Sequence, residues 1–197
     1  MNAINTDKKV QLTYGGLKSS TDTSGADYTI IGIPFDIRTT YRPGTRFGPD
    51  GIRRAFPTDS VNEAVGIDTS KYVKGVDYGD LDMWNAEKAY LGSIPQEMKA
   101  ILETGTIPIV LGGDHSITFP ELLAYKDVYG PVSIIHFDSH TDTWGSDTDK
   151  EHHDHSNPFR RAIEYDCIDP KTSIQVGMRG GLFEESDFDF ANNAGLE

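Results

Sequence analysis

Short apolar runs recur along the chain, and turn-forming residues follow each of them. Most of these runs are continuous in hydrophobicity, which is typical of β-strands that are buried on both faces. The pattern therefore predicts five strands, at residues 28–33, 73–78, 106–111, 132–137 and 173–176.

Segments of helical character separate the predicted strands. They are residues 48–55, 94–103, 116–125, 157–165 and 188–193. Strands that alternate with helices favour a parallel sheet with crossover helices on its faces, so the predicted fold class is α/β. Residues 1–25 are rich in Thr, Ser, Gly and Lys and predict a loose N-terminal arm. We therefore divide the chain into an arm, 1–27, and one folded domain, 28–197.

All six histidines lie between His115 and His155, around the third and fourth predicted strands. In an open parallel sheet, ligands bind beyond the carboxyl ends of the strands. Gly112 and Gly113 permit a tight turn after the third strand and deliver His115 to that edge. Asp114 is expected to cap the helix that follows.

A second polar group follows the fourth strand, where Asp138, His140 and Asp142 alternate along the chain. Residues two apart in an extended chain point to the same face, so these three converge if the strand conformation persists. Carboxylate and imidazole ligands suit Mn²⁺, Fe²⁺ or Zn²⁺, and the lack of thiolates argues against a structural zinc site. Without a cation, neighbouring carboxylates would raise each other's pKa. We predict a divalent metal site formed by these residues together with His115.

We do not expect His136, His152 or His153 to be metal ligands. His136 lies inside the fourth strand and is expected to be a core residue or a neighbour of the ligands. His152 and His153 are expected to be exposed loop residues.

Composition narrows the range of partners. The 197 residues include 18 Lys and Arg against 31 Asp and Glu, and the net charge of −13 would repel nucleic acid and anionic membranes. The single cysteine, Cys167, cannot form an internal disulfide and fits a reducing compartment. No apolar run approaches the ~20 residues that span a bilayer, and the N-terminus lacks the apolar segment of a signal peptide. We predict a soluble, cytoplasmic protein.

Three motifs together resemble a known family. They are GGDHS at 112–116, FDSHTD at 137–142, and IGIPFD followed by YRPGTRFGP within 31–49. They are similar to those of the ureohydrolases, the arginase and agmatinase superfamily, and within it to the agmatinase-like branch; Ser139 replaces the usual alanine of the second motif. The resemblance runs from about Tyr28 to the last residue. It implies a three-layer α/β/α sandwich with a mainly parallel sheet, and hydrolysis of a guanidino compound, most simply agmatine, to urea and an amine, putrescine.

The resemblance also implies a site with two Mn²⁺ ions. His115 would bind one ion, His140 the other, and Asp138 would bridge the pair. Asp142 would bind the same ion as His115 and would act in catalysis by accepting a hydrogen bond from a bridging hydroxide. The implied partner is a small cationic guanidino substrate, and the family commonly forms homo-oligomers.

His155 is the implied catalytic proton shuttle to the leaving amine, since imidazole titrates in the useful pH range. The loop departs from the family here, because Ser156 and Asn157 stand where Gly and Thr are usual. Arg42 and Arg46 belong to a loop that either contacts substrate at the rim of the site or forms a plain turn before the first helix.

Two family features are not found: a second metal motif, Ser-x-Asp-x-Asp followed by Asp-Pro, and a glutamate for the substrate guanidinium. The nearest lookalike, at 186–189, has the wrong spacing. We therefore expect the chain to be the N-terminal part of a ureohydrolase domain, without its last strands. The alternatives are a truncated non-catalytic family member, another guanidino-acid hydrolase such as a guanidinobutyrase, and a different binuclear metallohydrolase such as a phosphoesterase.

Overall fold

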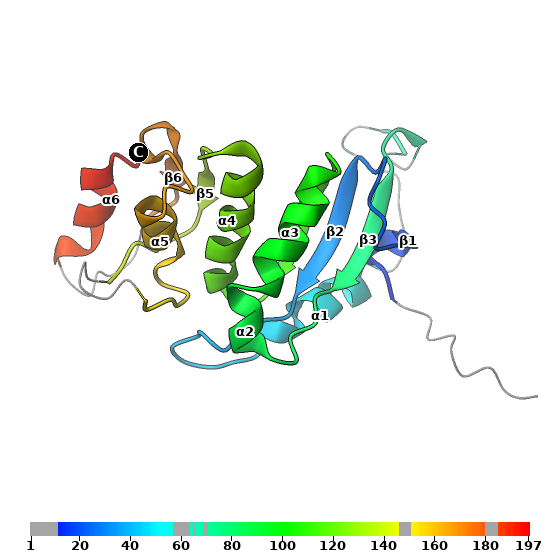
Figure 1. Cartoon of the computed structure of the whole chain (residues 1–197), viewed down its shortest axis with the longest axis horizontal. Helices are drawn as coiled ribbons and strands as arrows, with labels where there is room; N and C mark the ends of the chain where they lie inside the picture. The colour runs from blue at the N-terminus through cyan, green and yellow to red at the C-terminus, as the bar shows by residue number, and fades with distance from the viewer. Residues whose placement is uncertain (1–11, 57–63, 65, 69–70, 146–150, 180–184) are drawn as a thin grey trace, which may run out of the picture.

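The computed structural model describes residues 12–56, 64, 66–68, 71–145, 151–179 and 185–197. Four strands form one parallel sheet in the order β1-β3-β2-β4, and two more form a parallel pair, β5-β6. The strands are β1 (Lys18–Ser19), β2 (Tyr28–Ile33), β3 (Gly75–Asp80), β4 (Ile107–Gly112), β5 (Ile135–Phe137) and β6 (Ile174–Val176). The predicted α/β class with a mainly parallel sheet is confirmed (Figure 1).

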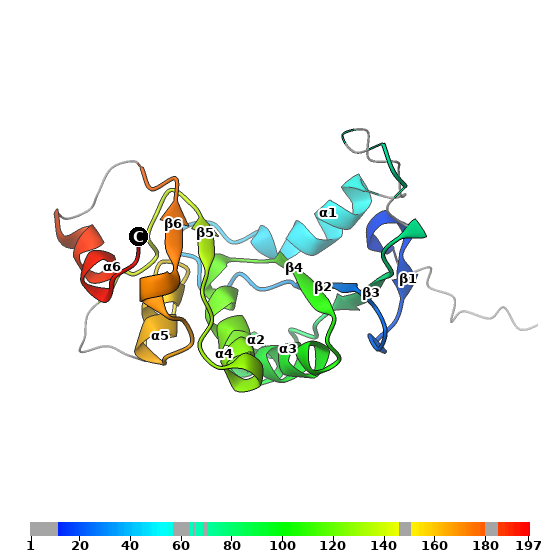
Figure 2. The same ribbon diagram turned by 90° about the horizontal axis from the view of Figure 1, so that it is seen from above.

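Helices flank the strands on both faces. In the described segments they are α1 (Gly48–Ala55), α2 (Ala86–Tyr90), α3 (Ser93–Glu103), α4 (Thr118–Tyr129), α5 (Pro158–Glu164) and α6 (Asp189–Ala194). Figure 2 shows α1 on one side of the four-stranded sheet and α2, α3 and α4 on the other. Within the described segments, every helix falls short of the length and apolar character that crossing a bilayer requires.

The main core lies between the four-stranded sheet and the layer of α3 and α4. All residues of β2 after the first are buried, as its continuous hydrophobicity predicts. Helix α3 buries Ile94, Met98, Ile101 and Leu102, a spacing of three and four residues that forms one apolar stripe. These side chains pack in the same cluster as Phe119 of α4.

The structure departs from the sequence-based elements at several ends. β3 begins two residues later than predicted, β5 begins three residues later, and the short helix α2 was not predicted. The described part of the predicted loose arm is also attached to the sheet. Lys18 pairs with Val76 in a parallel bridge, and the Tyr14 N–H donates to the Asp77 carboxylate at 2.7 Å. The sequence did not predict β1, because both residues of this edge strand have exposed side chains and so give no apolar signal.

A buried ion pair ties α1 to the sheet. Arg53 of α1 bonds both carboxylate oxygens of Asp77 on β3, with distances of 2.8 Å from Nε and 2.9 Å from a terminal nitrogen. Its other terminal nitrogen bonds Asp80. Arg53 is 4% exposed and Asp77 1% exposed, so the pair lies in the interior.

Candidate metal centre

The turn after β4 places His115 at the carboxyl end of that strand. Gly113 adopts a φ of +99°, and an added Cβ there would lie 2.5 Å from the Ile33 carbonyl oxygen. Only glycine fits this combination of backbone conformation and close approach. The predicted glycine turn is therefore confirmed, and the 3-10 turn His115–Ile117 begins directly after it.

Asp114 acts as the predicted helix cap. One carboxylate oxygen accepts the Ser116 N–H at 2.9 Å, and the other accepts the Arg38 N–H at 3.1 Å. The side chain is buried. These bonds account for Asp114 without a metal and join the turn after β4 to the loop after β2.

The chain turns at the end of β5 instead of continuing as a strand. Asp138 Oδ1 accepts the N–H groups of Ser139 at 2.5 Å and His140 at 2.9 Å. Asp142 then adopts a φ of +49°, in the left-handed region. The expected alternation therefore fails, because the side-chain-to-backbone bonds compete with extended structure. Asp138 and Asp142 come together through the turn, whereas the side chain of His140 is 52% exposed.

Four side chains form a cluster in which one ligand atom of each lies within 4.8 Å of the others: His115, His136, Asp138 and Asp142. His115 Nδ1 lies 2.5 Å from Asp142 Oδ2 and 3.9 Å from Asp138 Oδ2. His140 Nδ1 lies 3.5 Å from the other oxygen of Asp138, Oδ1. The Asp138 carboxylate thus faces His115 with one oxygen and His140 with the other, which is the arrangement that a bridging ligand requires.

Gln175 on β6 determines which nitrogen of the His136 imidazole carries the proton. The Gln175 amide nitrogen donates to the Thr141 carbonyl at 2.7 Å and lies 2.9 Å from His136 Nδ1. A carbonyl only accepts, so the amide nitrogen also donates to Nδ1, and the imidazole proton is on Nε2. Burial, reinforced by His115, lowers the pKa of His136 and keeps it neutral. Its Nε2 is buried without a hydrogen-bond partner and lies 3.6 Å from Asp138 Oδ2, so His136 is a close neighbour of this carboxylate.

We expect Gln175→Leu to weaken the binding of a divalent cation at this cluster by about 10-fold or more, because partners behind a ligand commonly contribute 10- to 100-fold to metal affinity. The variant removes the bond that orients His136 against Asp138. Calorimetric titration with Mn²⁺ measures the effect, and Gln96→Leu on α3 is the matched control. An unchanged dissociation constant in Gln175→Leu would show that this contact does not support the centre.

The donor set fits a divalent cation. Burial alone would raise the pKa of Asp138, but the N–H groups of His140 and Ser139, together with the nearby imidazoles of His136 and His115, offset this and hold the pKa below its ordinary value. The carboxylate is therefore ionised at neutral pH. Carboxylate oxygens combined with imidazole nitrogens, without a thiolate, favour Mn²⁺, Fe²⁺ or Zn²⁺ over calcium or a structural zinc site.

His155 lies outside this cluster. Its Nε2 is 2.9 Å from Thr40 Oγ1, and its backbone N–H donates to the Arg38 carbonyl at 3.3 Å. The loop that carries His155 therefore packs against the loop between β2 and α1. The role of His155 as a proton shuttle stays a prediction.

The two neighbouring histidines differ from each other. His152 is exposed, as predicted, and its Nε2 lies 2.8 Å from Asp154. The prediction for His153 was wrong, since it is 6% exposed. Its ring stacks on Phe119 with centroids 5.1 Å apart and meets the edge of Tyr90 at 5.8 Å. Two aromatic neighbours from distant segments bury this imidazole, which local sequence does not reveal.

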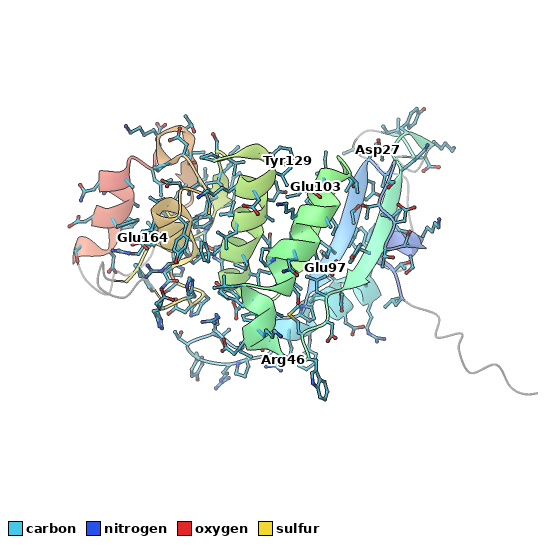
Figure 3. All side chains as sticks on the ribbon, viewed as in Figure 1. Asp27, Arg46, Glu97, Glu103, Tyr129 and Glu164 are labelled. Carbon is cyan, nitrogen blue, oxygen red and sulfur yellow. The ribbon has the colours of Figure 1, made fainter. Side chains whose placement is uncertain are left out.

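Asp36 organises the loop before α1. It is 1% exposed, accepts the N–H of Gly44 at 2.6 Å and that of Arg46 at 3.2 Å, and pairs with the Arg46 guanidinium. The hydrogen bond from Arg46 is the largest cause that lowers the pKa of Asp36. Figure 3 labels Arg46 beside α1, in this loop. The Arg46 guanidinium therefore stabilises the loop by pairing with Asp36, which favours the plain-turn alternative.

Gly48, the first residue of α1, lies close to the end of β4. An added Cβ on Gly48 would lie 2.2 Å from the Gly112 carbonyl oxygen, so glycine lets α1 approach the end of β4.

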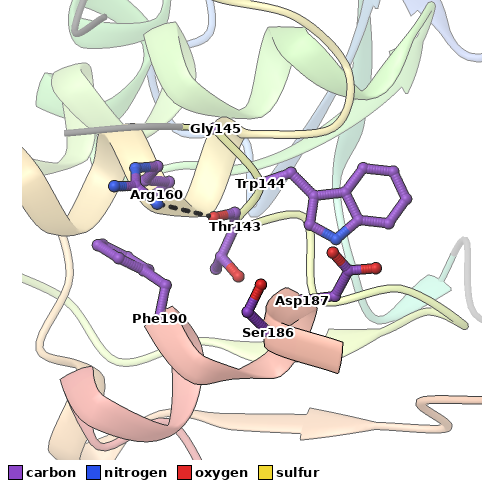
Figure 4. Close-up of a pocket in the computed structure, with 7 residues that line it drawn as sticks. All are labelled: Thr143, Trp144, Gly145, Arg160, Ser186, Asp187 and Phe190. Carbon is purple, nitrogen blue, oxygen red and sulfur yellow. Dashed lines mark hydrogen bonds between the residues drawn. The ribbon is translucent and has the colours of Figure 1, made fainter. Parts of the chain in front are cut away.

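Two cavities lie beside predicted metal ligands. One of about 380 Å³ lies between the ends of β4 and β5, and His115, His136 and Asp138 contribute to its wall. The second, of about 330 Å³, is lined by Thr143, Trp144, Gly145, Arg160, Ser186, Asp187 and Phe190 (Figure 4). The indole of Trp144 meets the His140 ring with centroids 5.8 Å apart, so this cavity begins beside a predicted ligand. The sequence gave no sign of this second cavity, because Trp144 and Asp187, which both line it, are some 40 residues apart in the chain.

Imidazoles and carboxylates at the carboxyl ends of parallel strands define the class of this protein, an α/β protein with a candidate divalent-metal centre. The model of the Arginase family matches residues 26–197. The chain belongs to this family, as the three motifs indicated.

Several proteins of known name are similar to the chain. The agmatinase of Chromobacterium violaceum is 37% identical over 185 residues, covering 86% of this chain and 56% of that protein. The mitochondrial guanidino acid hydrolase of Homo sapiens is 38% identical over 170 residues, covering 83% and 47%. The structure of the proclavaminate amidino hydrolase from Streptomyces clavuligerus matches with a TM-score of 0.80 at 31% identity, covering 94% and 62%. The chain thus spans about half the length of the relatives that it matches.

Proposed function

We propose that this chain supplies the His115, Asp138, His140 and Asp142 part of a binuclear Mn²⁺ ureohydrolase site, in a protein that cleaves a guanidino compound, most simply agmatine, into urea and an amine, putrescine. One observation carries the proposal: in a member of the arginase family, the two oxygens of the Asp138 carboxylate face His115 and His140 separately. The names of the relatives, agmatinase and guanidino acid hydrolase, support a guanidino substrate.

Two divalent cations, when bound, supply the chemistry that lowers the pKa of a water molecule to near neutrality. In this proposal His115 and Asp142 would hold one ion, His140 would hold the second, and Asp138 would serve both. The N–H groups of Ser139 and His140 hold the Asp138 carboxylate in place, and His136 lies beside it. Asp142 would also accept a hydrogen bond at the metal centre. Its side chain is only 9% exposed, so water competes little for this bond.

The cavity beside His140 is proposed to take the substrate's alkyl chain. Trp144 offers an aromatic wall, and Figure 4 shows the Asp187 carboxylate on the same side of the cavity as the indole. A carboxylate favours the ammonium tail of agmatine over the carboxylate tail of guanidinobutyrate. The overall charge of −13 also favours a cationic substrate.

The test is urea release from agmatine and from 4-guanidinobutyrate, with Mn²⁺ and after EDTA treatment, and with phosphate release from a phosphomonoester measured in parallel. We expect Mn²⁺-dependent urea with agmatine preferred. Urea from guanidinobutyrate alone would select the guanidinobutyrase alternative, which the similarity to the guanidinobutyrase of Pseudomonas aeruginosa at 35% identity makes the second candidate. Phosphate release without urea would contradict the proposal.

His155 is proposed to deliver the proton to the leaving amine. We expect His155→Ala to reduce kcat for urea release by about 100-fold, the lower end of the range for a general acid. Mn²⁺ affinity should stay unchanged, because His155 lies outside the cluster and contacts Thr40. His152→Ala, which removes an exposed imidazole three residues away, is the control. Equal rates in the two variants would remove His155 from the mechanism.

We also propose a cytoplasmic location, supported by the lone cysteine, and a homo-oligomeric state, supported by family resemblance. The charge of the chain opposes nucleic acid as a partner.

A further inference from the structure

The side chain of Arg38, in the loop between β2 and α1, contacts two other segments of the chain. Its Nη1 donates to the His153 carbonyl at 2.7 Å, and its Nη2 pairs with the carboxylate of Glu87 on α2 at 2.7 Å. The guanidinium lies over the ring of Tyr90, also on α2, with its carbon 4.3 Å from the ring centroid. The side chain is only 20% exposed. A guanidinium that bonds in two directions and stacks on an aromatic ring has one defined position.

The backbone of Arg38 is attached to the turn that carries His115. The Arg38 N–H donates to the Asp114 carboxylate at 3.1 Å, and the Asp114 N–H donates to the Phe35 carbonyl at 2.7 Å. The loop is therefore joined to the residue directly before a proposed metal ligand. These bonds use the backbone of Arg38 and not its side chain, so a substitution of the side chain leaves them in place.

The same loop contacts the segment that carries His155. The Arg38 carbonyl accepts the His155 N–H at 3.3 Å, and Thr40 Oγ1 lies 2.9 Å from His155 Nε2. The Arg38 guanidinium bonds the carbonyl of His153, two residues earlier, so one residue binds both ends of the segment 153–155. Figure 1 shows the loop passing below α2 toward the segment that precedes α5.

The residue after His155 is attached to the other side of the site. The Ser156 carbonyl accepts the Trp144 N–H at 3.2 Å, and the Trp144 indole meets the ring of His140, the ligand proposed for the second ion. His155 thus lies between two attachments. The one to Trp144 is a bond between backbone groups, whereas the one to Arg38 also depends on a charged side chain.

We propose that Arg38 is a positioning residue, whose side chain keeps the His155 imidazole at a fixed place relative to the turn of His115. This inference rests on the proposed role of His155 as proton donor. A general acid has to stay within hydrogen-bond reach of its target, and a displacement of about 1 Å can reduce a rate by about 100-fold. The bonding partners of the Arg38 side chain, His153 and Glu87, lie outside the metal cluster, so Arg38 acts through His155.

Amide hydrogen exchange of the metal-free 197-residue chain tests the proposal. In Arg38→Ala, the His155 N–H should exchange about 10-fold faster or more, because loss of a charge-assisted bond lets the segment open locally. The N–H of Ile31, which is buried in β2, should exchange as in the wild type. A purely structural role would loosen the sheet as well, so acceleration at His155 alone distinguishes positioning from general stability.

Two further variants complete the comparison. Arg38→Lys should exchange as fast at His155 as Arg38→Ala does, because a single ammonium lacks the planar fork that reaches Glu87 and His153 together. Arg54→Ala removes an exposed arginine that also pairs with a carboxylate, and this matched control should keep wild-type exchange at His155.

Turnover and metal affinity then show whether the position of His155 matters to the reaction. Arg38→Ala should reduce kcat for urea release by about 10-fold or more. The dissociation constant for Mn²⁺ should stay unchanged, because the bond from the Arg38 N–H to Asp114 remains.

Several results would overturn the proposal. They are a His155 N–H that exchanges without protection in the wild type, unchanged exchange there in Arg38→Ala, equal acceleration at His155 and Ile31, and wild-type kcat in Arg38→Ala. A wild-type chain that binds Mn²⁺ but releases no urea would count against the proposed activity, and the exchange rates would still decide whether Arg38 holds His155 in place.

Discussion

Asp138→Ala is expected to abolish Mn²⁺ binding and to reduce urea release by more than about 100-fold, beyond the loss typical of a residue behind the ligands. Asp138 is the one cluster member whose two oxygens face two imidazoles on different sides, His115 at 3.9 Å and His140 at 3.5 Å. Its removal deprives both proposed ions of a charged ligand. Equilibrium dialysis with Mn²⁺ measures the loss directly.

A second substitution separates charge from backbone support. Asp138 Oδ1 also holds the turn through the N–H groups of Ser139 and His140, and Asn keeps an acceptor for those bonds. Asp138→Asn should therefore fold as the wild type does and still lose Mn²⁺. Asp50→Ala, which removes an exposed carboxylate of α1 and changes the net charge equally, is the control. Wild-type Mn²⁺ affinity in Asp138→Asn would exclude this residue as a ligand.

Arg53→Ala is expected to lower the free energy of unfolding by about 3–5 kcal/mol, the cost of removing one partner of a buried ion pair. The substitution leaves the carboxylate of Asp77, which is 1% exposed, without its guanidinium. Since Arg53 is the charged contact between α1 and β3, the helix should also loosen from the sheet. Urea denaturation followed by far-ultraviolet circular dichroism measures the difference.

The adjacent arginine provides a matched control. Arg54 pairs with Asp50 on the surface of the same helix, where its side chain is 68% exposed, and Arg54→Ala should lower the stability far less, because exposed ion pairs contribute little. Equal destabilisation by the two substitutions would mean that the buried pair contributes no more than the surface pair, because alanine forms helices at least as well as arginine at both positions.

Sequence reasoning succeeded where a signal is local. The continuous apolar run at Tyr28–Ile33 and the segment Gly48–Ala55, with Pro49 in its first turn, match β2 and α1 in both bounds. It failed where tertiary contacts decide. β1 has two exposed residues and no apolar signal, and α2 is a five-residue helix that begins with the Asn85 side chain as its cap.

The candidate site shows the same division. Motif spacing identified His115, Asp138 and Asp142, which the structure gathers in one cluster, and it placed His136 beside them as a neighbour. The prediction that these residues continue the strand was wrong, because the Asp138 carboxylate accepts hydrogen bonds from the two following N–H groups and the chain turns there. The bond from Gln175, 39 residues beyond His136, is a contact between strands that no local pattern encodes.

The central claim is that one carboxylate of this chain joins two metal ions, and electron paramagnetic resonance during Mn²⁺ titration tests it most directly. We predict that the wild-type protein gives the spectrum of two exchange-coupled Mn²⁺ ions as the second equivalent binds, and that His140→Ala leaves only an isolated ion. A wild-type spectrum of isolated ions at every ratio, or no bound Mn²⁺, would contradict the account.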